Sequence, residues 1–392
     1  MSQRLIDRSP DLRKLRDEGF DIEIRSSFLL VRNVPYVNAK AEVRVGTLVS
    51  ELNLAGDVTT RPNTHVVYFI GEHPCNKDGS EISQIKHQSQ NTTLDKDLVV
   101  NHSFSNKPPE GYKDYYEKMA TYIAIISNPA RSIDPNVTAK IFPVIETSED
   151  ESVFKFIDTA SSRAGISAVT RKLELGKIAI VGLGGTGAYI LDLVAKTPVK
   201  EIHLYDGDVF SQHNAFRSPG APSVEELKQK PLKVQYFREL YSKIHRGIVP
   251  HGHYIQASNI EQLRGMDFCF LCLDASEHKK LIVENLMEWG IPFIDVGMGV
   301  LLENETLRGI LRVTTSTKDK QDHVNTKNRI PFSDVDNNEY SRNIQVADLN
   351  ALNASLAVVR WKKFVGFYAD LEKEYNTTYT IDGNHLINED QL

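Results

Sequence analysis

Closely spaced glycines are the first feature of this sequence that could bind a ligand. The segment KIAIVGLGGTGAYILDL (177–193) contains Gly182, Gly184 and Gly187 in a G-x-G-x-x-G spacing, with Gly185 between them. Glycine lets the backbone turn tightly and approach a ligand closely, and the N-terminus of a following helix presents free N–H groups to a phosphate. The spacing therefore predicts a bound nucleotide, with NAD as one alternative. The other alternative is a purely structural turn from strand to helix.

Polar residues after the next predicted strand favour a triphosphate. The segment LYDGDVFSQHNAFRS contains the pair Asp206 and Asp208, followed by Asn214 and Arg217. An NAD enzyme needs one acid here, for the ribose, and Asp206 fits that role. NAD binding gives no reason for Asp208, Asn214 and Arg217. Asn and Arg donate hydrogen bonds to phosphate oxygens, and Lys233 offers a point charge to the same oxygens. The set therefore favours ATP.

A further carboxylate, Asp274, follows the apolar segment MDFCFLCL (266–273). The end of a parallel strand lies at the sheet edge where open α/β folds bind ligands. Mg²⁺ prefers one or two carboxylates together with phosphate oxygens, so Asp274 is the predicted metal ligand. Each of these residues alone could cap a turn or a helix, but that interpretation does not explain their order.

The ordered set resembles the ThiF/MoeB/E1-like adenylyltransferase superfamily, whose members use ATP to activate ubiquitin-like and sulphur-carrier proteins. The resemblance covers residues 155–368. It implies ribose binding by Asp206, phosphate binding by the Asn, Arg and Lys, and Mg²⁺ binding by Asp274. Asp208 matches the second acid of the family. Arg163 matches an arginine that reaches the ATP of the opposite subunit, which implies a homodimer.

The implied reaction is adenylation of the C-terminal glycine carboxylate of a ubiquitin-like protein, with release of pyrophosphate. An E2-like acceptor protein is a further implied partner. Three alternatives stay open: adenylation of a non-protein carboxylate as in the tRNA-modifying branch, an NAD-dependent oxidoreductase, and a non-catalytic ATP-binding adaptor of the same fold. The intact set of residues disfavours the last two.

The cysteines do not follow the pattern of many relatives. Cys269 and Cys272 lie inside an apolar segment, no cysteine follows them, and two C-x-x-C pairs are missing, so we expect no zinc and no thioester within the adenylation domain. Cys75 with the nearby His73 is an alternative nucleophile. A hydroxyl in the segment TTSTK (314–318), which we assign to a loop, is another acceptor candidate.

The elements that must position these residues alternate between strand and helix. Residues 177–183, 201–208, 248–256, 266–274 and 291–299 read as strands, and 187–197, 226–244, 276–290 and 344–368 read as helices. Strands alternating with helices predict a mostly parallel sheet covered on both faces. We therefore expect a Rossmann-like ThiF/E1 adenylation domain over residues 151–392. A strand at 307–317 and a long loop at 316–342 complete it.

The first 150 residues differ in character, and we expect a smaller α+β accessory domain there. Residues 28–37, 41–52 and 64–72 read as strands, and 111–130 as a helix or a helix-to-strand segment, ended by Asn128 and Pro129. Its tyrosines form either a packed aromatic face or a docking surface for a partner; they are Tyr112, Tyr115, Tyr116 and Tyr122. The acidic segment 145–156 is predicted to be a hinge.

The bulk composition excludes several classes. The chain of 392 residues carries a net charge of -6, which does not favour nucleic acid as a partner, and its three cysteines form no disulfide framework. No apolar run reaches the length of a membrane helix, and the charged N-terminus lacks the apolar core of a signal peptide. We therefore expect a cytoplasmic protein that does not bind a membrane.

Overall fold

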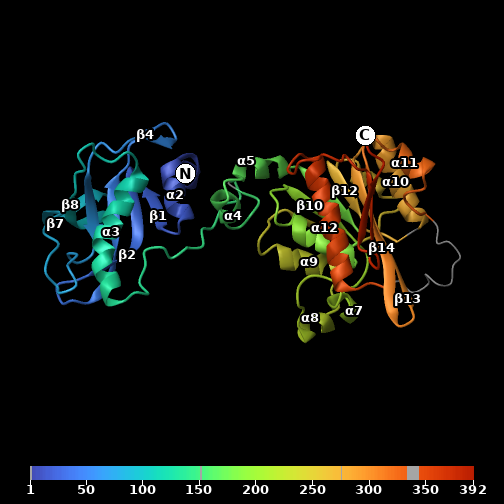
Figure 1. Cartoon of the computed structure of the whole chain (residues 1–392), viewed down its shortest axis with the longest axis horizontal. Coiled ribbons are helices and arrows are strands. Elements are labelled where there is room, and N and C mark those ends of the chain that lie inside the picture. Colours follow the sequence, from blue (N-terminus) through green and yellow to red (C-terminus); the bar gives the residue numbers. More distant parts are fainter. Residues whose placement is uncertain (1, 151, 275, 333–343) are drawn as a thin grey trace. The chain divides into compact units, whose positions relative to one another are not determined.

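The structure is a computed structural model that describes residues 2–150, 152–274, 276–332 and 344–392. The chain divides into two compact units, Met1–Ile145 and Glu146–Leu392 (Figure 1). Each unit has its own hydrophobic core. Among the described residues, no helix combines the length and the apolar character that crossing a membrane requires.

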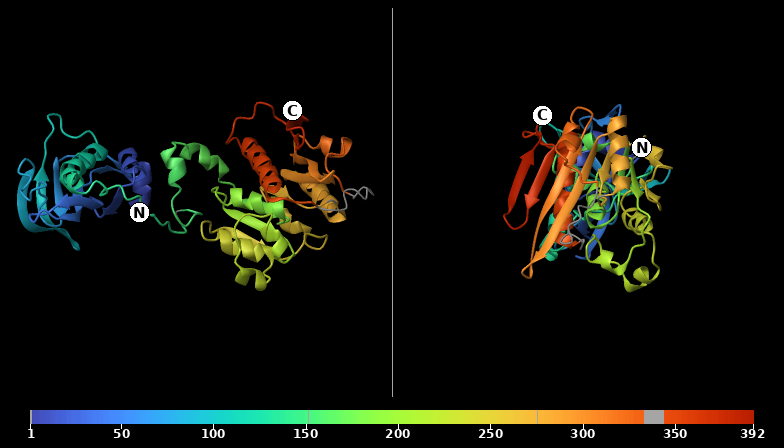
Figure 2. Two further views of the ribbon diagram at one scale, coloured as in Figure 1. Left: turned by 60° about the horizontal axis from the view of Figure 1, so that its bottom comes forward. Right: turned by 90° about the vertical axis from the view of Figure 1, so that its right-hand side faces the viewer.

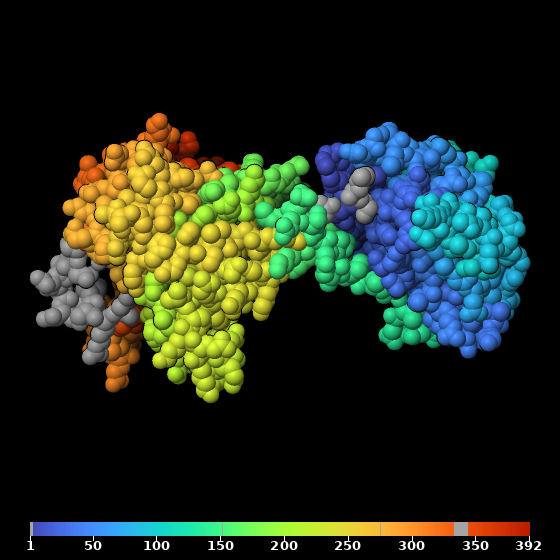
Figure 3. Space-filling view, turned by 180° about the vertical axis from the view of Figure 1, so that it is seen from behind, coloured from blue at the N-terminus to red at the C-terminus, as the bar shows by residue number. Residues whose placement is uncertain are grey.

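The first unit contains a six-stranded antiparallel sheet with the order β1-β2-β3-β6-β8-β7. Its strands are β1 (Asp21–Arg25), β2 (Phe28–Val37), β3 (Val43–Glu51), β6 (Val66–Ile70), β7 (Lys86–Asp95) and β8 (Leu98–Ser105), and β4 (Leu54–Ala55) pairs separately with β5 (Val58–Thr59). The predicted strands correspond to β2, β3 and β6. The sequence did not predict β7, because this edge strand is polar and mostly exposed (cyan in Figure 3).

Helices α1 (Ser2–Arg8), α2 (Pro10–Asp17) and α3 (Tyr115–Ile133) complete the first unit. The N-cap of α3 is Asp114, whose carboxylate accepts a hydrogen bond from the Glu117 N–H at 2.7 Å. The prediction that this helix ends at Pro129 was wrong. Ile126 and Ala130 are fully buried in the core, and this packing outweighs the hydrogen bond that a proline cannot donate.

The second unit contains an eight-stranded sheet with the order β11-β10-β9-β12-β13-β14-β15-β16. In this spatial order, neighbouring strands from β11 to β13 pair in parallel, and neighbouring strands from β13 to β16 pair antiparallel. The bounds are β9 (Lys177–Val181), β10 (Glu201–Tyr205), β11 (Ile248–His251), β12 (Phe268–Leu271), β13 (Phe293–Glu303), β14 (Thr306–Ser316), β15 (Asn376–Thr380) and β16 (His385–Glu389). The long hairpin of β13 and β14 extends past the neighbouring strands (Figure 2).

Helices cover both faces of this sheet, as the alternating pattern predicted. One face packs against α6 (Gly185–Val194), α9 (Lys233–Tyr241) and α12 (Ala347–Phe364). The other packs against α10 (Glu277–Trp289) and the short helix η2 (Ile260–Leu263). Shorter helices connect these elements: α4 (Thr159–Arg163), α5 (Ser167–Thr170), η1 (Arg171–Leu173), α7 (Gln212–Ala215), α8 (Val224–Lys228) and α11 (Asp322–Thr326).

Three local predictions for this unit need correction. The helix expected over 226–244 is divided into α8 and α9, because Lys230 has a φ of 51° and Pro231 follows it. Thr314, Thr315 and Ser316 belong to β14 and are buried, so they are not loop hydroxyls available as acceptors. The loop predicted over 316–342 contains α11, and its residues from 333 onward lie outside the described residues.

Residues of the acidic segment around residue 150 form hydrogen bonds within the second unit, and the predicted hinge stays a prediction. The Arg246 guanidinium donates hydrogen bonds to the Thr147 hydroxyl and the Ser152 carbonyl oxygen, both at 3.1 Å. The Lys155 N–H donates to the Ile244 carbonyl oxygen at 2.9 Å. The second unit therefore includes residues that precede its first helix.

Candidate functional site

The glycine turn between β9 and α6 is packed tightly against the end of β12. Gly182 has a φ of 92°, a left-handed conformation that side chains disfavour, and a Cβ there would lie 2.5 Å from the Cys272 carbonyl oxygen. A Cβ on Gly187 would lie 2.0 Å from the Gly182 carbonyl oxygen. Both positions therefore require glycine for steric reasons.

The buried Asn350, on α12, supports this turn from behind. A Cβ on Gly185 would lie 2.0 Å from its Nδ2 atom. The Thr186 hydroxyl donates to Asn350 Oδ1 at 2.9 Å, and Asn350 Nδ2 donates to the Arg217 carbonyl oxygen at 3.3 Å. Asn350 thus connects the glycine turn to the segment that carries Arg217. Asn350 was not identified from the sequence.

The N-terminus of α6 is open toward a ligand. Gly184 is its N-cap, and no side chain of the described residues caps this helix end. In contrast to its three neighbours, Gly184 has no atom of the described residues within 4 Å of the position that a Cβ would occupy. Uncapped N–H groups beside free space are the arrangement that binds a phosphate.

The two acids after β10 share one lysine. Asp206 is 5% exposed, and its Oδ2 atom accepts a hydrogen bond from the Leu183 N–H at 2.7 Å, which fixes it to the glycine turn. Lys233 Nζ lies 2.6 Å from Asp208 Oδ2 and 3.4 Å from Asp206 Oδ2. The structure therefore brings together three residues that the sequence predicted to share a site.

Tyr254, which the sequence did not single out, completes this cluster from the loop after β11. Its hydroxyl donates to Asp208 Oδ1, and a Cβ on Gly207 would lie 2.8 Å from its ring. Burial tends to raise the pKa of Asp208, but the hydrogen bonds from Lys233 and Tyr254 outweigh burial and hold it below the usual value. The same contact with Asp208, aided by burial, raises the pKa of Tyr254 to about 12.

Asn214 and Arg217 lie in and just after the short helix α7. Asn214 is 4% exposed, and its side-chain oxygen accepts a hydrogen bond from the Ser211 N–H at 2.8 Å. The amide N–H groups of Asn214 therefore remain as its donors. Arg217 Nε is buried and has no hydrogen-bond partner within the part of the chain that the structure describes. A buried donor without an acceptor is costly, and a phosphate oxygen would supply the missing acceptor.

Asp274 and Arg163 both occupy exposed positions. Asp274 lies between the end of β12 at Leu271 and the N-cap of α10 at Ser276, and it is exposed. Arg163 ends α4 and is exposed. The role of Asp274 toward a metal and that of Arg163 toward a second subunit stay predictions.

The structure does not favour any cysteine as a nucleophile. The Cys75 thiol is buried and donates to the His73 carbonyl oxygen at 3.3 Å, while His73 Nδ1 lies 2.9 Å from the Pro74 carbonyl oxygen. Burial raises the pKa of Cys75, and it also raises the pKa values of Cys269 and Cys272. A reactive cysteine needs a lowered pKa.

Among the described residues, no group of three or more His, Cys, Asp or Glu side chains is arranged to hold a metal ion. Mg²⁺ bound mainly through phosphates needs only one or two carboxylates. Asp274 therefore remains the candidate ligand for Mg²⁺, and the expectation that zinc is not used stays a prediction.

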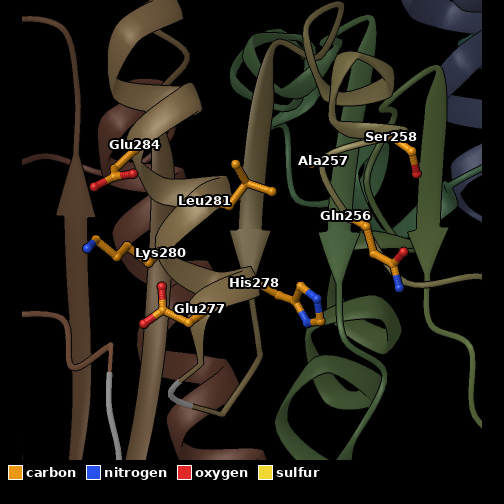
Figure 4. Close-up of a pocket in the computed structure, with 8 residues that line it drawn as sticks. All are labelled: Gln256, Ala257, Ser258, Glu277, His278, Lys280, Leu281 and Glu284. Carbon is orange, nitrogen blue, oxygen red and sulfur yellow. The ribbon is translucent and has the colours of Figure 1, made fainter.

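An open pocket of about 640 Å³ lies between α10 and the segment 256–258. His278 and Leu281 point toward Gln256 across it, and Lys280 and Glu284 point to the other side of the helix (Figure 4). None of the residues predicted from the sequence lines this pocket. The predicted nucleotide site and this pocket are thus separate features of the second unit.

Two protein families match the chain over adjacent ranges. The ThiF family matches residues 158–386, and a domain family of unknown function (DUF6791) matches residues 10–159. Among curated proteins, no significant match is found.

Several solved structures are similar to the chain at low identity. The crystal structure of PaaA has a TM-score of 0.44 and 16% identity, covering 57% of this chain and 76% of that chain. Escherichia coli MccB with MccA-N7isoASN has a TM-score of 0.44 and 17% identity, with 60% and 70% coverage. The microcin C7 biosynthetic enzyme MccB in complex with N-formylated MccA has a TM-score of 0.45 and 17% identity. The match covers 59% of this chain and 70% of that chain. At these identities the likeness concerns the fold alone.

Proposed function

Because this chain belongs to the ThiF family, we propose that its second unit is an adenylyltransferase that acts on the C-terminal glycine carboxylate of a ubiquitin-like protein. A carboxylate oxygen of that glycine attacks the α-phosphorus of ATP. The bond between the α-phosphorus and the bridging oxygen breaks, and pyrophosphate leaves with the electron pair. No protein nucleophile is needed, since the reaction requires positioning and charge stabilisation.

The observation that carries this proposal is the position of Lys233. Its Nζ atom lies within 3.4 Å of both acids of the D-x-D pair, and Asp206 is bonded to the backbone of the glycine turn. A cation beside the uncapped N-terminus of α6 suits a polyphosphate. Asp206 is then the ribose ligand, and Asp208 holds Lys233 in place before the nucleotide binds.

The remaining predicted residues have roles around the same nucleotide. Asn214 and Arg217 donate to phosphate oxygens, and the buried Arg217 Nε without a partner supports this role. Asp274 would hold Mg²⁺, which supplies positive charge to the phosphates when bound. Arg163 would contact the nucleotide of the partner subunit in a homodimer.

The fate of the acyl-adenylate is part of the proposal. Cys269 lies within β12 and Cys272 directly follows it. Burial raises the pKa values of both thiols, so neither suits thioester formation. The activated tail would pass directly to an acceptor, for which an E2-like protein is one candidate. Such a protein would act in the cytoplasm.

Exchange of labelled pyrophosphate into ATP tests this function. We expect exchange that requires a ubiquitin-like protein with a free C-terminal glycine, and none with the same protein lacking that residue. Asp274→Ala should abolish exchange. Asp319→Ala, at an exposed position, is the matched control. Exchange that does not depend on the tail would exclude this substrate, and unchanged exchange in Asp274→Ala would refute the metal assignment.

A further inference from the structure

A buried cluster of three charged residues lies directly behind the segment that carries Asp274. Lys279, in the first turn of α10, is 2% exposed, and its Nζ atom lies 2.7 Å from Asp295 Oδ1 on β13. Asp295 is fully buried, and its Oδ2 atom lies 2.6 Å from Arg312 Nη2 on β14. The cluster joins α10 to the two strands beside it.

This cluster is expensive for the fold by itself. Removing charges from water costs several kcal/mol for each ion even in a good pair (roughly, from measurements on other proteins). A lysine in the first turn also opposes the helix dipole, which favours anions there. Two cations share the one carboxylate of Asp295, so a net positive charge remains in the cluster. If the role of these three positions were purely structural, apolar residues of similar size would fill them at a lower free-energy cost.

Lys279 makes one further contact that connects the cluster to the site. Its Nζ atom donates to the Leu273 carbonyl oxygen at 3.1 Å, and Leu273 directly precedes Asp274. On the other side of Leu273, the Cys272 N–H donates to the Val181 carbonyl oxygen at 2.8 Å. The backbone before Asp274 is therefore fixed both to β9 and to Lys279.

The far end of the cluster is fixed as well. Arg312 Nη1 donates to the Thr314 hydroxyl at 2.5 Å. A Cβ on Gly297, opposite Arg312 in the hairpin, would lie 2.7 Å from Nη2. The absence of a side chain on Gly297 thus leaves room for the guanidinium across the strand, where it orients Asp295.

We propose that Lys279, held by Asp295 and Arg312, is a positioning residue for the metal–nucleotide complex. By fixing the Leu273 carbonyl group, it sets the direction in which Asp274 presents its carboxylate. This inference rests on the proposed function, because it assumes that Asp274 is a metal ligand.

The test uses the full chain, with Mn²⁺ as the probe and a non-hydrolysable ATP analogue. Free and bound Mn²⁺ are measured by electron paramagnetic resonance, and affinity for the analogue without metal is measured separately. We expect Lys279→Met to weaken Mn²⁺ binding about 10- to 100-fold, as is usual for residues that orient metal ligands. Affinity for the metal-free analogue should stay within about twofold, since Lys279 does not contact the nucleotide. Lys279→Arg, which keeps the charge and a donor, should restore most of the Mn²⁺ affinity.

Arg360→Met is the matched control, because Arg360 forms a similarly buried ion pair with Asp370 at 2.6 Å. It should lower thermal stability and leave Mn²⁺ affinity unchanged. If Lys279→Met behaves as Arg360→Met does, the role of Lys279 is structural and the inference is overturned. If Lys279→Met does not fold, Arg312→Gln, which keeps the Lys279–Asp295 pair, must still weaken Mn²⁺ binding. Failure of the wild-type chain to bind Mn²⁺ with the analogue would instead overturn the proposed function.

Discussion

The two units of this protein use their polar side chains in opposite ways. In the second unit, Asp206, Asp208 and Lys233 meet beside an uncapped helix N-terminus at the edge of a sheet. In the first unit, the polar groups of Tyr115, Tyr122 and Lys118 are fully buried in the core. The first arrangement leaves groups available to a ligand, and the second uses them to hold the fold.

The tyrosines of the first unit show this difference clearly. The Tyr115 hydroxyl donates to Asn53 Oδ1 at 3.0 Å, and the Tyr122 hydroxyl donates to the His65 carbonyl oxygen at 2.5 Å. Burial raises the pKa of Tyr115 to about 12. Tyr112 is 3% exposed, so the alternative of a tyrosine docking surface was wrong for these three residues. Tyr116, which is partly exposed, is bonded to Glu18.

The comparison teaches that the surroundings of a buried polar group matter more than its burial. Asp206 and Lys233 are buried beside the N-terminus of α6, whereas Lys118 is buried within a hydrophobic core. Substitutions in the two units should therefore have separable effects, which can be measured on one chain. Changes at the sheet edge should alter nucleotide chemistry, and changes in the first core should alter stability.

The largest contrast is expected between two lysines. Lys233→Ala should lower tail-dependent pyrophosphate exchange about 10²- to 10³-fold, because it removes a preorganised charge from the phosphates. Lys118→Met in the first unit should leave the exchange rate within about twofold, since Lys118 is buried in the core of that unit, where its Nζ atom donates to the Ser50 hydroxyl. Lys228→Ala, at an exposed position near Lys233, is the local control. Equal decreases of the exchange rate in Lys233→Ala and Lys118→Met would contradict the proposed difference between the two units.

The next effect concerns the pH dependence of stability in the first unit. Burial lowers the pKa of Lys118 to about 8, and its Nζ atom donates to the Ser50 hydroxyl at 2.9 Å. Because the unfolded chain binds the proton more tightly, stability should increase from pH 8 to 10.5, by on the order of 3 kcal/mol. Below pH 8 the penalty is fully present. Scanning calorimetry of the full chain should show this increase, and Lys118→Met should remove it.

A third test compares two glycines of the same turn. Gly187→Ala should lower the free energy of unfolding of the second unit by about 1–3 kcal/mol, because its Cβ would meet the Gly182 carbonyl oxygen. Gly184→Ala has space for its Cβ, so it should leave stability nearly unchanged and weaken ATP binding. Denaturant titration and nucleotide titration separate the two. Similar stability losses in both variants would contradict the open space assigned to Gly184.

The smallest expected effect compares two tyrosine hydroxyls that donate to carboxylates, one in each unit. Tyr254→Phe should raise the KM for ATP up to about tenfold, because Asp208 loses a charge-assisted hydrogen bond that helps to orient Lys233. Tyr116→Phe removes the bond to Glu18 and should leave this KM unchanged. An unchanged KM in both variants would remove Tyr254 from the site.

Much of the fold and part of the site could be predicted from the sequence. Strands 28–37 and 177–181 were recognisable from local apolar runs, and the glycine turn with Asp206 follows directly from a strand–turn–helix unit. Polar strands such as β7, and the C-terminal strands β15 and β16, gave no such signal. Their pairing with neighbouring strands decides their conformation.

The sequence by itself determined the order of the chemical groups: four glycines, two acids, Asn214, Arg217, Lys233 and Asp274. Short-range geometry is enough to place the glycines, the two acids and Asp274, because these lie at or shortly after the end of a strand. Only the tertiary structure decided which distant side chains support them. Asn350 reaches Gly185 from α12, and Tyr254 reaches Asp208 from the loop after β11. Lys279 on α10 forms an ion pair with Asp295 on β13. Such contacts depend on how helices pack against the sheet, and no local pattern specifies that packing.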